Sequence, residues 1–351
     1  MRLLLWLLSP LSYLYQFFFF LDKSRQTSVQ LDGAFVISVG NLSFGGTGKT
    51  PVVQAIIKLL LKRFPDYQYT ILSRGYKAGL SGQGALVSAS SLPIEVGDEP
   101  LLHKQSLPNV QVIIGGNRVK SYLTFNQMKN GPHIVLLDDG FQHHRIKRNM
   151  DIVLLDANAP FGNGFTIPLG TLREKPHALQ RATAVLFTKV NSQNRENVIP
   201  VQKKIQSKYP HLPNFVSKFE PKLEVVVSSI SSSVDSYCLV TGVGNPTSVL
   251  KTSNELIQKQ PIRMIQFPDH HHYTELDLEK IVNQLAINEA LLTTEKDWVK
   301  WKFLPSFLSK VKERNIQISL LKIELVVEQF EKWESLFIDH VSNYAKGISP
   351  V

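Results

Sequence analysis

A glycine-rich segment near the start of the chain has the residue types of a nucleotide-binding loop. Residues 38–51 read SVGNLSFGGTGKTP and lie between an apolar run at 34–39 and a helical pattern at 49–63. In such a loop, glycines let backbone N–H groups converge on phosphate oxygens at a helix N-terminus. The Lys49 ammonium would reach the β- and γ-phosphates, and the Thr50 hydroxyl would ligate Mg²⁺. The predicted nucleotide-binding residues are Ser43, Phe44, Gly45, Gly46, Thr47, Gly48, Lys49 and Thr50.

This loop departs from the strict eight-residue pattern at its first position, where Ser43 replaces the usual glycine. Gly45 and Gly46 compensate by giving the element GGTGKT. A glycine-rich turn that carries a surface lysine is the simpler alternative. Because a predicted strand, a glycine loop, a predicted helix and Gly-Lys-Thr coincide, we favour nucleotide binding.

Two adjacent carboxylates follow another apolar run. Residues 133–137 lead into DDGFQHH at 138–144, which places Asp138 and Asp139 at the end of a predicted strand. A P-loop protein needs a carboxylate there to hold Mg²⁺ directly or through water, and adjacent carboxylates are costly unless a cation neutralises them. Asp-Gly is also a common turn dipeptide, so an ordinary turn is the alternative. The upstream loop favours the magnesium role.

Short apolar runs alternate with helical patterns along most of the chain, which predicts an α/β fold with parallel sheets. Strands are expected at 34–39, 69–72, 112–114, 133–137, 152–155 and 184–187, and again at 237–241, 262–267, 290–292 and 316–321. Helices are expected to start near 97–100 with an acidic cap, after the caps Asn117 and Thr274, at Thr294, and over 324–344.

These elements divide into four predicted parts. A membrane-associated apolar helix over 1–25 precedes a P-loop NTPase-like lobe with a parallel sheet over 26–199. Residues 200–235, rich in proline and serine with one isolated strand at 224–228, form an inter-lobe linker. A second, smaller α/β lobe follows over 236–351, and the active site is expected between the lobes.

The first of these parts contains a long uncharged stretch. Residues 3–21 read LLLWLLSPLSYLYQFFFFL, which as a helix would extend roughly 28 Å, close to the ~30 Å hydrocarbon core of a bilayer. A signal peptide and a buried core helix both fit poorly, because no cleavage site follows and a terminal helix this apolar needs a large groove. Ser9, Ser12 and Gln16 form a polar stripe, so the helix either spans the membrane or lies in its interface.

Composition limits the possible partners and protein classes. The 351 residues are 43% hydrophobic, which excludes wholesale disorder, and a single cysteine excludes a disulfide framework or a cysteine-rich zinc site. The net charge of +10 favours an anionic partner such as an acidic membrane, a nucleic acid or a phosphorylated substrate. No recognition motif points to nucleic acid, so we expect none.

The motifs together resemble those of the tetraacyldisaccharide 4'-kinase family, the lipid A 4'-kinases of Gram-negative bacteria. Besides the loop and DDGFQHH, the resemblance rests on LSRGYK at 72–77, GDEP at 97–100, PLGTLRE at 168–174, FPDHH at 267–271 and TTEKDWVK at 293–300. It covers nearly the whole chain. TTEKDWVK is otherwise predicted only to begin a helix.

This resemblance implies an activity and a place. The protein would transfer the γ-phosphoryl group of ATP to the 4'-hydroxyl of a tetraacylated glucosamine disaccharide 1-phosphate, at the cytoplasmic face of the inner membrane. The expected partners are ATP with Mg²⁺, the acylated disaccharide 1-phosphate lipid and the inner membrane surface. A membrane-bound P-loop switch that hydrolyses ATP or GTP is the alternative from a different class.

The resemblance also implies roles for single residues. The aspartate of GDEP would act as the base towards the hydroxyl, assisted by the histidine that follows the aspartate of FPDHH; we assign these as Asp98 and His270. Arg118 would stabilise charge at the transferring phosphate, and Glu174 would lie near the metal. The implied catalytic residues are Asp98, His270 and Arg118, and the implied metal ligands are Thr50, Asp138, Asp139 and Glu174.

Elementary chemistry supports a carboxylate base for such a reaction. A sugar hydroxyl is a poor nucleophile, so a nearby carboxylate that accepts its proton is useful. An adjacent histidine holds that carboxylate oriented and ionised. From the residues alone, Asp98 serves equally well as a helix cap, and the histidines at 270–272 read equally as a solvated loop.

Overall fold

The fold is organised around one mixed sheet. The computed structural model describes residues 9–25, 27–128, 131–228, 236–285 and 289–347. The strands are β1 (Ala34–Asn41), β2 (Gln68–Ser73), β3 (Ala85–Leu86), β4 (Gln111–Ile114), β5 (His133–Asp138), β6 (Met150–Asp156), β7 (Ala184–Thr188), β8 (Asn214–Val227), β9 (Ser236–Thr241), β10 (Arg263–Gln266), β11 (Glu289–Thr294) and β12 (Ile318–Val327). Over these described residues they follow the order β10-β9-β11-β12-β8-β7-β6-β1-β5-β2-β4-β3. Neighbours run parallel except for β8 with β12 and β3 with β4.

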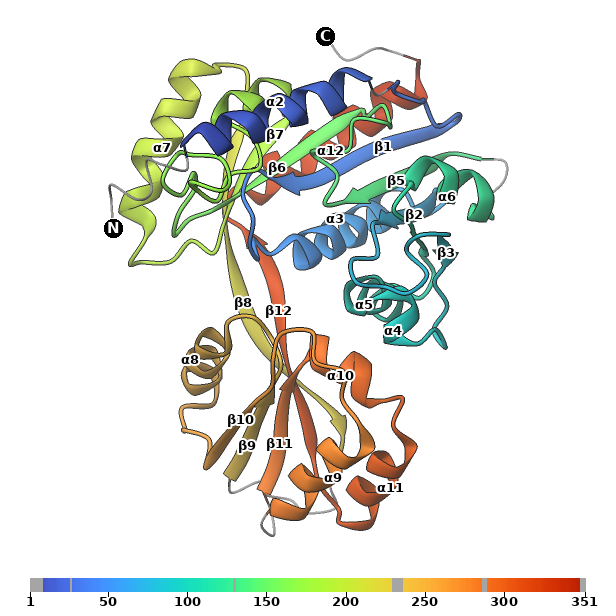
Figure 1. The fold of residues 1–351 in the computed structure, drawn as a ribbon, viewed down its shortest axis with the longest axis vertical. Helices are drawn as coiled ribbons and strands as arrows, with labels where there is room; N and C mark the ends of the chain where they lie inside the picture. The colour runs from blue at the N-terminus through green and yellow to red at the C-terminus, as the bar shows by residue number, and fades with distance from the viewer. Residues whose placement is uncertain (1–8, 26, 129–130, 229–235, 286–288, 348–351) are drawn as a thin grey trace.

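Helices cover the sheet in both lobes (Figure 1). They are α2 (Ser9–Arg25), α3 (Lys49–Arg63), α4 (Pro93–Val96), α5 (Asp98–Ser106), α6 (Arg118–Phe125), α7 (Arg195–Lys208), α8 (Pro246–Ile257), α9 (Glu275–Gln284), α10 (Glu295–Trp301), α11 (Pro305–Glu313) and α12 (Phe330–Ala345), with a 3₁₀ turn at Pro176–Arg181. Every residue of β1 and β5 is buried, as expected for parallel strands covered on both faces. The strands predicted from apolar runs in both lobes are confirmed, with small differences at most of their ends and with β12 running on to Val327.

Two antiparallel strands connect the lobes (Figure 1). The start of β8 pairs with β7 in the first lobe, and the rest pairs with β12, which in turn joins β11 in the second lobe. The strand expected at 224–228 is confirmed up to Val227, but it is not isolated, because it ends a fourteen-residue strand with two partners. At Pro221, β8 pairs with β12 alone. A strand that is paired on one side leaves alternate N–H groups unused, so a proline is tolerated there. The 200–235 segment contains the end of α7 and all of β8.

The last helix returns to the first lobe. A helix was predicted over 324–344, but β12 continues to Val327 and α12 begins at Phe330. Trp333, Phe337 and Val341 on α12 are buried in the core that also contains α3 and β1. The Tyr344 hydroxyl donates to the Ala34 carbonyl oxygen at 3.2 Å, which fixes the end of the helix against β1.

Local cap signals were mostly correct. Asn117 accepts a hydrogen bond from the Lys120 N–H, and Thr274 forms a capping box with Asp277, so both predicted caps are confirmed. The helix start expected at 97–100 is confirmed, since α5 begins at Asp98 with Pro100 in its first turn, but the acidic cap is wrong. Gly97 precedes α5 with φ 88°, and Asp98 is the first helical residue, whose carboxylate is free to face elsewhere.

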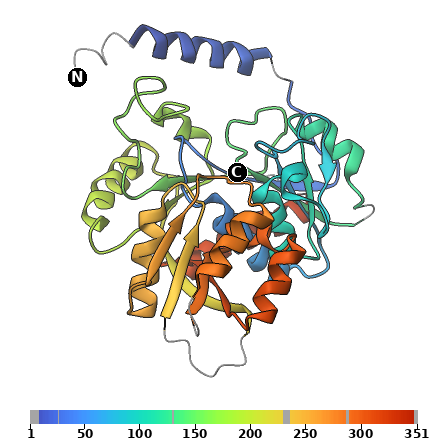
Figure 2. The ribbon, with the colours of Figure 1, turned by 60° about the horizontal axis from the view of Figure 1, so that its bottom comes forward.

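The described part of the N-terminal segment is a helix that lies across one end of the molecule (Figure 2). Within α2, the polar stripe faces the protein: Ser12 Oγ donates to the Thr166 carbonyl oxygen at 3.0 Å, and Gln16 Nε2 to Thr166 Oγ1 at 2.9 Å. Phe17 and Phe18 on the opposite side are more than half exposed. Among the described helices, none combines the length and the apolarity that crossing a bilayer requires. Part of the apolar stretch, residues 1–8, lies outside the described residues.

Candidate active site

The glycine-rich loop connects β1 to α3. Gly48 adopts φ 81° at the residue before α3, a conformation that glycine reaches without strain. Thr47 is held from two sides, because Asn41 Nδ2 donates to its Oγ1 at 3.1 Å and Thr188 Oγ1 donates to its carbonyl oxygen at 2.8 Å. Lys189 Nζ also bonds the Gly46 carbonyl oxygen. Side chains at the ends of β1 and β7 thus hold the loop in place.

Sheet register brings the acidic pair beside this loop. β1 lies between β5 and β6, and Val39 on β1 pairs with Asp138 on β5. Both strands end at the same edge of the sheet because they are parallel. The Lys49 ammonium therefore lies 3.8 Å from Asp139 Oδ1.

Asp138 is a buried carboxylate with one unsatisfied oxygen. Its Oδ2 lies 3.4 Å from Nε2 of the buried His103, while its Oδ1 has no hydrogen-bond partner among the described residues. Burial raises the pKa of Asp138, but His103 and the charges of Lys49 and Arg118 outweigh burial and hold the pKa below its ordinary value. An ionised oxygen with no partner is a position that a cation would fill.

Asp139 is more exposed than Asp138 and pairs with an arginine. It adopts φ 51°, and both of its carboxylate oxygens accept from NH1 of Arg173, at 3.0 and 2.9 Å. The Arg173 guanidinium also lies over the Phe44 ring at 4.7 Å, which links the acidic pair to the glycine-rich loop. Asp139 thus has cationic neighbours from the loop helix and from the 168–174 motif.

Arg118 and Glu174, two further predicted site residues, both form hydrogen bonds within the protein. Arg118 is 4% exposed and donates from NH2 to the Asp138 carbonyl oxygen at 2.7 Å and from NH1 to that of Asp139 at 3.1 Å. Glu174 Oε1 accepts from Arg181 NH2 at 2.5 Å and from Gln142 Nε2 at 3.0 Å. Arg118 therefore shapes the backbone beneath the acidic pair, and Glu174 has a cationic partner.

Metal-binding clusters were sought over the described part of the chain. There, no group of three or more histidine, cysteine, aspartate or glutamate side chains is placed to hold a metal ion alone. Magnesium in phosphoryl-transfer sites is commonly held by one or two carboxylates with a hydroxyl and substrate phosphates. The unsatisfied oxygen of Asp138, next to the Lys49–Thr50 end of α3, fits that arrangement.

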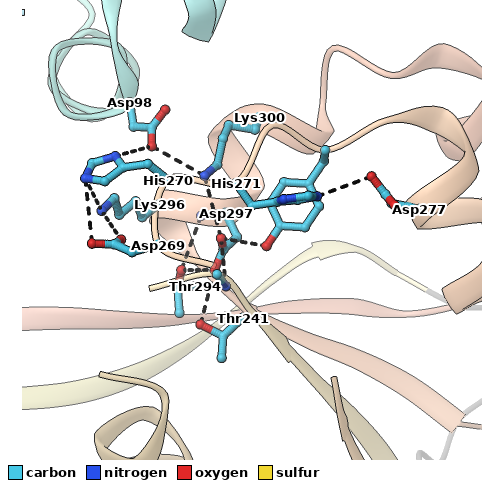
Figure 3. A network of polar contacts seen from close by, with 12 residues as sticks. Asp98, Thr241, Asp269, His270, His271, Asp277, Thr294, Lys296, Asp297 and Lys300 are labelled. Carbon is cyan, nitrogen blue, oxygen red and sulfur yellow. Dashed lines mark hydrogen bonds and ion pairs between the residues drawn. The ribbon is translucent and has the colours of Figure 1, made fainter. Parts of the chain in front are cut away.

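Asp98 and His270 come together across the two lobes (Figure 3). Nδ1 of His270 lies 3.1 Å from Oδ2 of Asp98, although 172 positions separate them in the chain. Asp98 is on α5 in the first lobe, and His270, at φ 64°, lies in the loop after β10 in the second. Burial raises the pKa of Asp98, but the hydrogen bond from His270 and the charge of Lys300 outweigh burial, so the pKa lies below its ordinary value.

The start of α5 connects this pair to the acidic pair. α5 packs against both α3 and α10. Burial and the charge of Asp138 raise the pKa of Glu99, while Lys296 and Lys49 act in the opposite direction. Glu99 therefore lies within electrostatic range of the P-loop lysine, the acidic pair and α10, next to Asp98 in the chain.

The structure thus gathers most of the predicted residues around one region and adds others. Sequence reasoning missed the roles of Arg173, His103 and Lys300, whose side chains pair with Asp139, Asp138 and Asp98. Arg173 and Lys300 both lie inside motifs that carried the family resemblance, at 168–174 and 293–300. His103 is one turn beyond GDEP on α5, and its helical spacing from Glu99 was the available signal.

Comparison with known proteins decides the family. A family model described as tetraacyldisaccharide-1-P 4'-kinase matches residues 4–342. The chain belongs to the tetraacyldisaccharide-1-P 4'-kinase family. The resemblance drawn from the motifs is therefore confirmed, and the chain is a phosphotransferase of this family.

Individual relatives support the same assignment over most of the chain. The protein named tetraacyldisaccharide 4'-kinase from Leptospira biflexa is 43% identical over 355 residues, covering 95% of this chain and 95% of the relative. The Syntrophobacter fumaroxidans protein of that name is 36% identical over 293 residues, covering 79% of this chain and 74% of the relative. The crystal structure of LpxK from Aquifex aeolicus in complex with ATP is similar with a TM-score of 0.70 and 27% identity, covering 96% of this chain and 99% of that one. This likeness confirms the mixed α/β class with a large parallel sheet.

Proposed function

We propose that this 4'-kinase family member transfers the γ-phosphoryl group of ATP to the 4'-hydroxyl of a tetraacyldisaccharide 1-phosphate. The observation that carries the proposal is the pairing of Asp98 with His270 at the helix that packs against the P-loop helix α3. A nucleotide switch that only hydrolyses ATP or GTP has no need of a second carboxylate–histidine pair supplied by another lobe. The pair is what a sugar hydroxyl requires as its proton acceptor.

Asp98 is the group that accepts the proton of the acceptor hydroxyl. Its lowered pKa keeps the carboxylate ionised near neutral pH. His270 donates its Nδ1–H to one carboxylate oxygen and thereby orients the other. The proton moves from the hydroxyl to Asp98 as the oxygen attacks the γ-phosphorus, and ADP leaves in line with the attack.

The negative charge of the phosphates would be neutralised by the glycine-rich loop and the acidic pair with its metal ion. The loop from Ser43 to Thr50 presents backbone N–H groups at the positive end of α3, and Lys49 reaches the terminal phosphates. Mg²⁺ would be held by Thr50, Asp138 and Asp139, and it would neutralise the phosphate oxygens when bound. Arg173 holds the Asp139 carboxylate through a hydrogen bond. A role of Arg118 at the transferring phosphate and of Glu174 at the metal stays a prediction.

The acceptor is an acylated lipid, so we propose that the protein works at the cytoplasmic face of the inner membrane. Support comes from α2, which presents exposed Leu14, Phe17 and Phe18 while its polar stripe binds the body. The net charge of +10 suits an anionic lipid surface. The division into a helix over 1–25, lobes over 26–199 and 236–351, and a connection over 200–235 stays a proposal, and within it α12 of the last part packs against the first lobe.

A direct assay tests the proposal. The purified protein is incubated with Mg²⁺, [γ-³²P]ATP and tetraacyldisaccharide 1-phosphate in mixed micelles, and the lipids are separated by thin-layer chromatography. We expect label on the disaccharide. Label that appears only as free phosphate, at a rate unaffected by the lipid, would support the nucleotide switch instead.

The Asp98→Asn variant tests the assigned base. The amide keeps the size of the side chain but accepts no proton, so we expect kcat to fall by about 10²–10⁴-fold. The Kd of an ATP analogue, measured by fluorescence, should change less than about threefold because Asp98 contacts no phosphate in the proposed mechanism. A variant that turns over at the wild-type rate would remove Asp98 from the mechanism. Lys302→Gln, which replaces a cation at the end of α10, is the matched control and should retain activity.

A further inference from the structure

The motif TTEKDWVK at 293–300 has no part in the mechanism described above, yet the structure directs it at the catalytic pair. Thr294 caps α10, and the helix points Lys296 and Lys300 towards Asp98 and His270 (Figure 3). The two lysines are four residues apart and so lie on one face of the helix. Each ammonium contacts one member of the pair.

Lys300 is a buried ammonium that bridges two carboxylates. Its side chain is 4% exposed, and Nζ lies 3.3 Å from Asp98 Oδ2 and 3.8 Å from Asp297 Oδ1. The Tyr273 ring lies 5.2 Å from the same nitrogen. A buried ammonium is costly to desolvate unless it is paired, so this placement has to be maintained by its partners.

Asp297 is fixed more firmly than either lysine. Its fully buried carboxylate accepts hydrogen bonds from the Gly242 N–H at 3.1 Å, from the Tyr273 hydroxyl at 2.9 Å and from Thr294 Oγ1 at 2.7 Å. Thr241 Oγ1 is a further donor at 3.3 Å. Asp297 is therefore a rigid anchor in the second lobe, and it determines where the Lys300 ammonium lies.

Lys296 fixes the histidine. Its Nζ lies 3.3 Å from His270 Nε2 and 3.0 Å from Asp269 Oδ1. An ammonium only donates hydrogen bonds, so Nε2 of His270 is the acceptor and carries no proton. The ring hydrogen is then on Nδ1, which donates it to Asp98 Oδ2.

Both donors therefore meet the same oxygen of Asp98. His270 Nδ1 and Lys300 Nζ contact Oδ2, whereas no described residue donates a hydrogen bond to Oδ1. We propose that Lys300 is a positioning residue of the kinase reaction: anchored by Asp297, it fixes Asp98 Oδ2 so that Oδ1 faces the acceptor hydroxyl and takes its proton. This inference rests on the proposed function, because it concerns the base of that reaction.

The contact between Lys300 and Asp98 also affects the pKa of Asp98. The titratable groups that face Asp98 are His270 and Tyr273 from the loop after β10, and Lys296 and Lys300 from α10. Burial raises the pKa of Asp98, and the hydrogen bond from His270 together with the charges of Lys300, His270 and Lys296 brings the pKa below its ordinary value. Removing the nearer ammonium therefore raises this pKa. The base then becomes protonated, and inactive, at a higher pH than in the wild type.

Lys300→Met tests the proposal, because methionine matches the length of the lysine stem without its charge. We expect kcat to fall about 10- to 100-fold and the acidic limb of the kcat–pH profile to move up by about 1–2 units. KM for the disaccharide and Kd for ATP should stay within about threefold, since Lys300 binds neither substrate in the proposal. Lys302→Met, two positions further along, is the matched control and should keep the wild-type profile.

Other outcomes would overturn the proposal. An unshifted acidic limb, or a loss confined to KM, would show that Lys300 does not act through Asp98. If Lys300→Met folds poorly by circular dichroism, Lys300→Arg supplies the comparison: it keeps the charge but spreads it over a planar fork. We then expect an unshifted limb with kcat about tenfold lower, and a wild-type kcat would contradict the positioning role. A wild-type protein that places no label on the disaccharide would instead refute the proposed function.

Discussion

At the scale of single residues, the charges of the site are compensated in pairs drawn from different elements. Asp138 on β5 faces His103 on α5, and Asp98 on α5 faces Lys300 on α10. A buried carboxylate is stable only with such partners, and deleting one partner leaves the other charge uncompensated. Substitutions at these positions therefore disturb both charge and position. Conservative replacements, with ligand affinity measured separately from turnover, distinguish the two effects.

Gly48 provides a test of how the loop is built. A Cβ at this position would lie 2.3 Å from Cζ of Phe219, and its φ of 81° strains any side chain. We therefore expect Gly48→Ala to lower the free energy of unfolding by about 1–3 kcal/mol. Urea denaturation of the ligand-free protein measures this change.

Gly46→Ala is the comparison within the same loop. A Cβ there meets no atom within 4 Å, and its backbone does not have a positive φ. Its free energy of unfolding should stay within about 0.5 kcal/mol of the wild type. Equal losses for the two variants would mean that the Phe219 contact and the backbone angle do not constrain the loop.

At the scale of secondary structure, the sequence predicted the buried strands and missed the ribbon. β1, β5, β6 and β7 are covered on both faces, so their continuous apolar runs identify them. From Lys218 onward β8 has no buried residue and mixes charged residues with a proline, a pattern that single-sequence reasoning takes for irregular chain. Only the pairing with β12 makes it a strand, and pairing is not a local property.

The site shows the same division. The P-loop and the acidic pair are each local patterns, and the parallel pairing of β1 with β5 follows from the predicted fold class. Asp98 and His270 have no local signature that relates them, because they belong to different lobes, and only the family resemblance joined them. Lys300 could not be assigned at all, since its role depends on a helix face that packs against α5.

His133, at the start of β5, gives a prediction on pH. Burial lowers its pKa to about 4. The Thr70 hydroxyl donates to Gln111 Oε1, so it accepts from His133 Nε2, and the Tyr122 hydroxyl donates to Nδ1. The neutral ring thus has a partner at each nitrogen, and after protonation of Nδ1 the Tyr122 hydroxyl would have to turn and accept. Burial is what disfavours the charged ring between β2, β5 and α6.

The sign of the effect follows from this lowered pKa. The unfolded chain binds the proton near pH 6.5 and the folded protein near 4, so stability is lost as the pH falls through that window. Between pH 7 and pH 5 the loss from this residue is about 2 kcal/mol. From pH 7 to pH 5, we expect the free energy of unfolding of His133→Gln, measured by urea titration, to fall by about 2 kcal/mol less than that of the wild type. His211→Gln, at an exposed position, should behave as the wild type; an unchanged slope for His133→Gln would refute the assignment.

At the scale of the whole molecule, α2 presents exposed apolar side chains outward. α2 lies across an end of the first lobe (Figure 2), held there by Ser12 and Gln16 through the backbone and hydroxyl of Thr166. A helix that packs on a protein usually buries its apolar side, and here the polar side is inward. Under the proposed function, a membrane-embedded acylated substrate would account for this orientation, because the protein would approach it from the bilayer surface.

Phe17 and Phe18 test this arrangement, since they are 54% and 60% exposed on the outward side of α2. Each phenylalanine that enters an interface contributes about 1.4 kcal/mol or more, so Phe17→Gln with Phe18→Gln should weaken binding to vesicles by about 10²-fold. Co-sedimentation with phosphatidylethanolamine–phosphatidylglycerol vesicles measures the partition. Leu123→Gln removes an apolar residue of α6 that is 70% exposed, and this variant should bind as the wild type. Because both phenylalanines are more than half exposed and the nucleotide loop is held by Asn41 and Thr188, ATP affinity should not change in the double variant. Undiminished vesicle binding would leave the outward aromatic face without its proposed role, and a parallel loss of ATP affinity would point to a folding defect rather than to lost membrane contact.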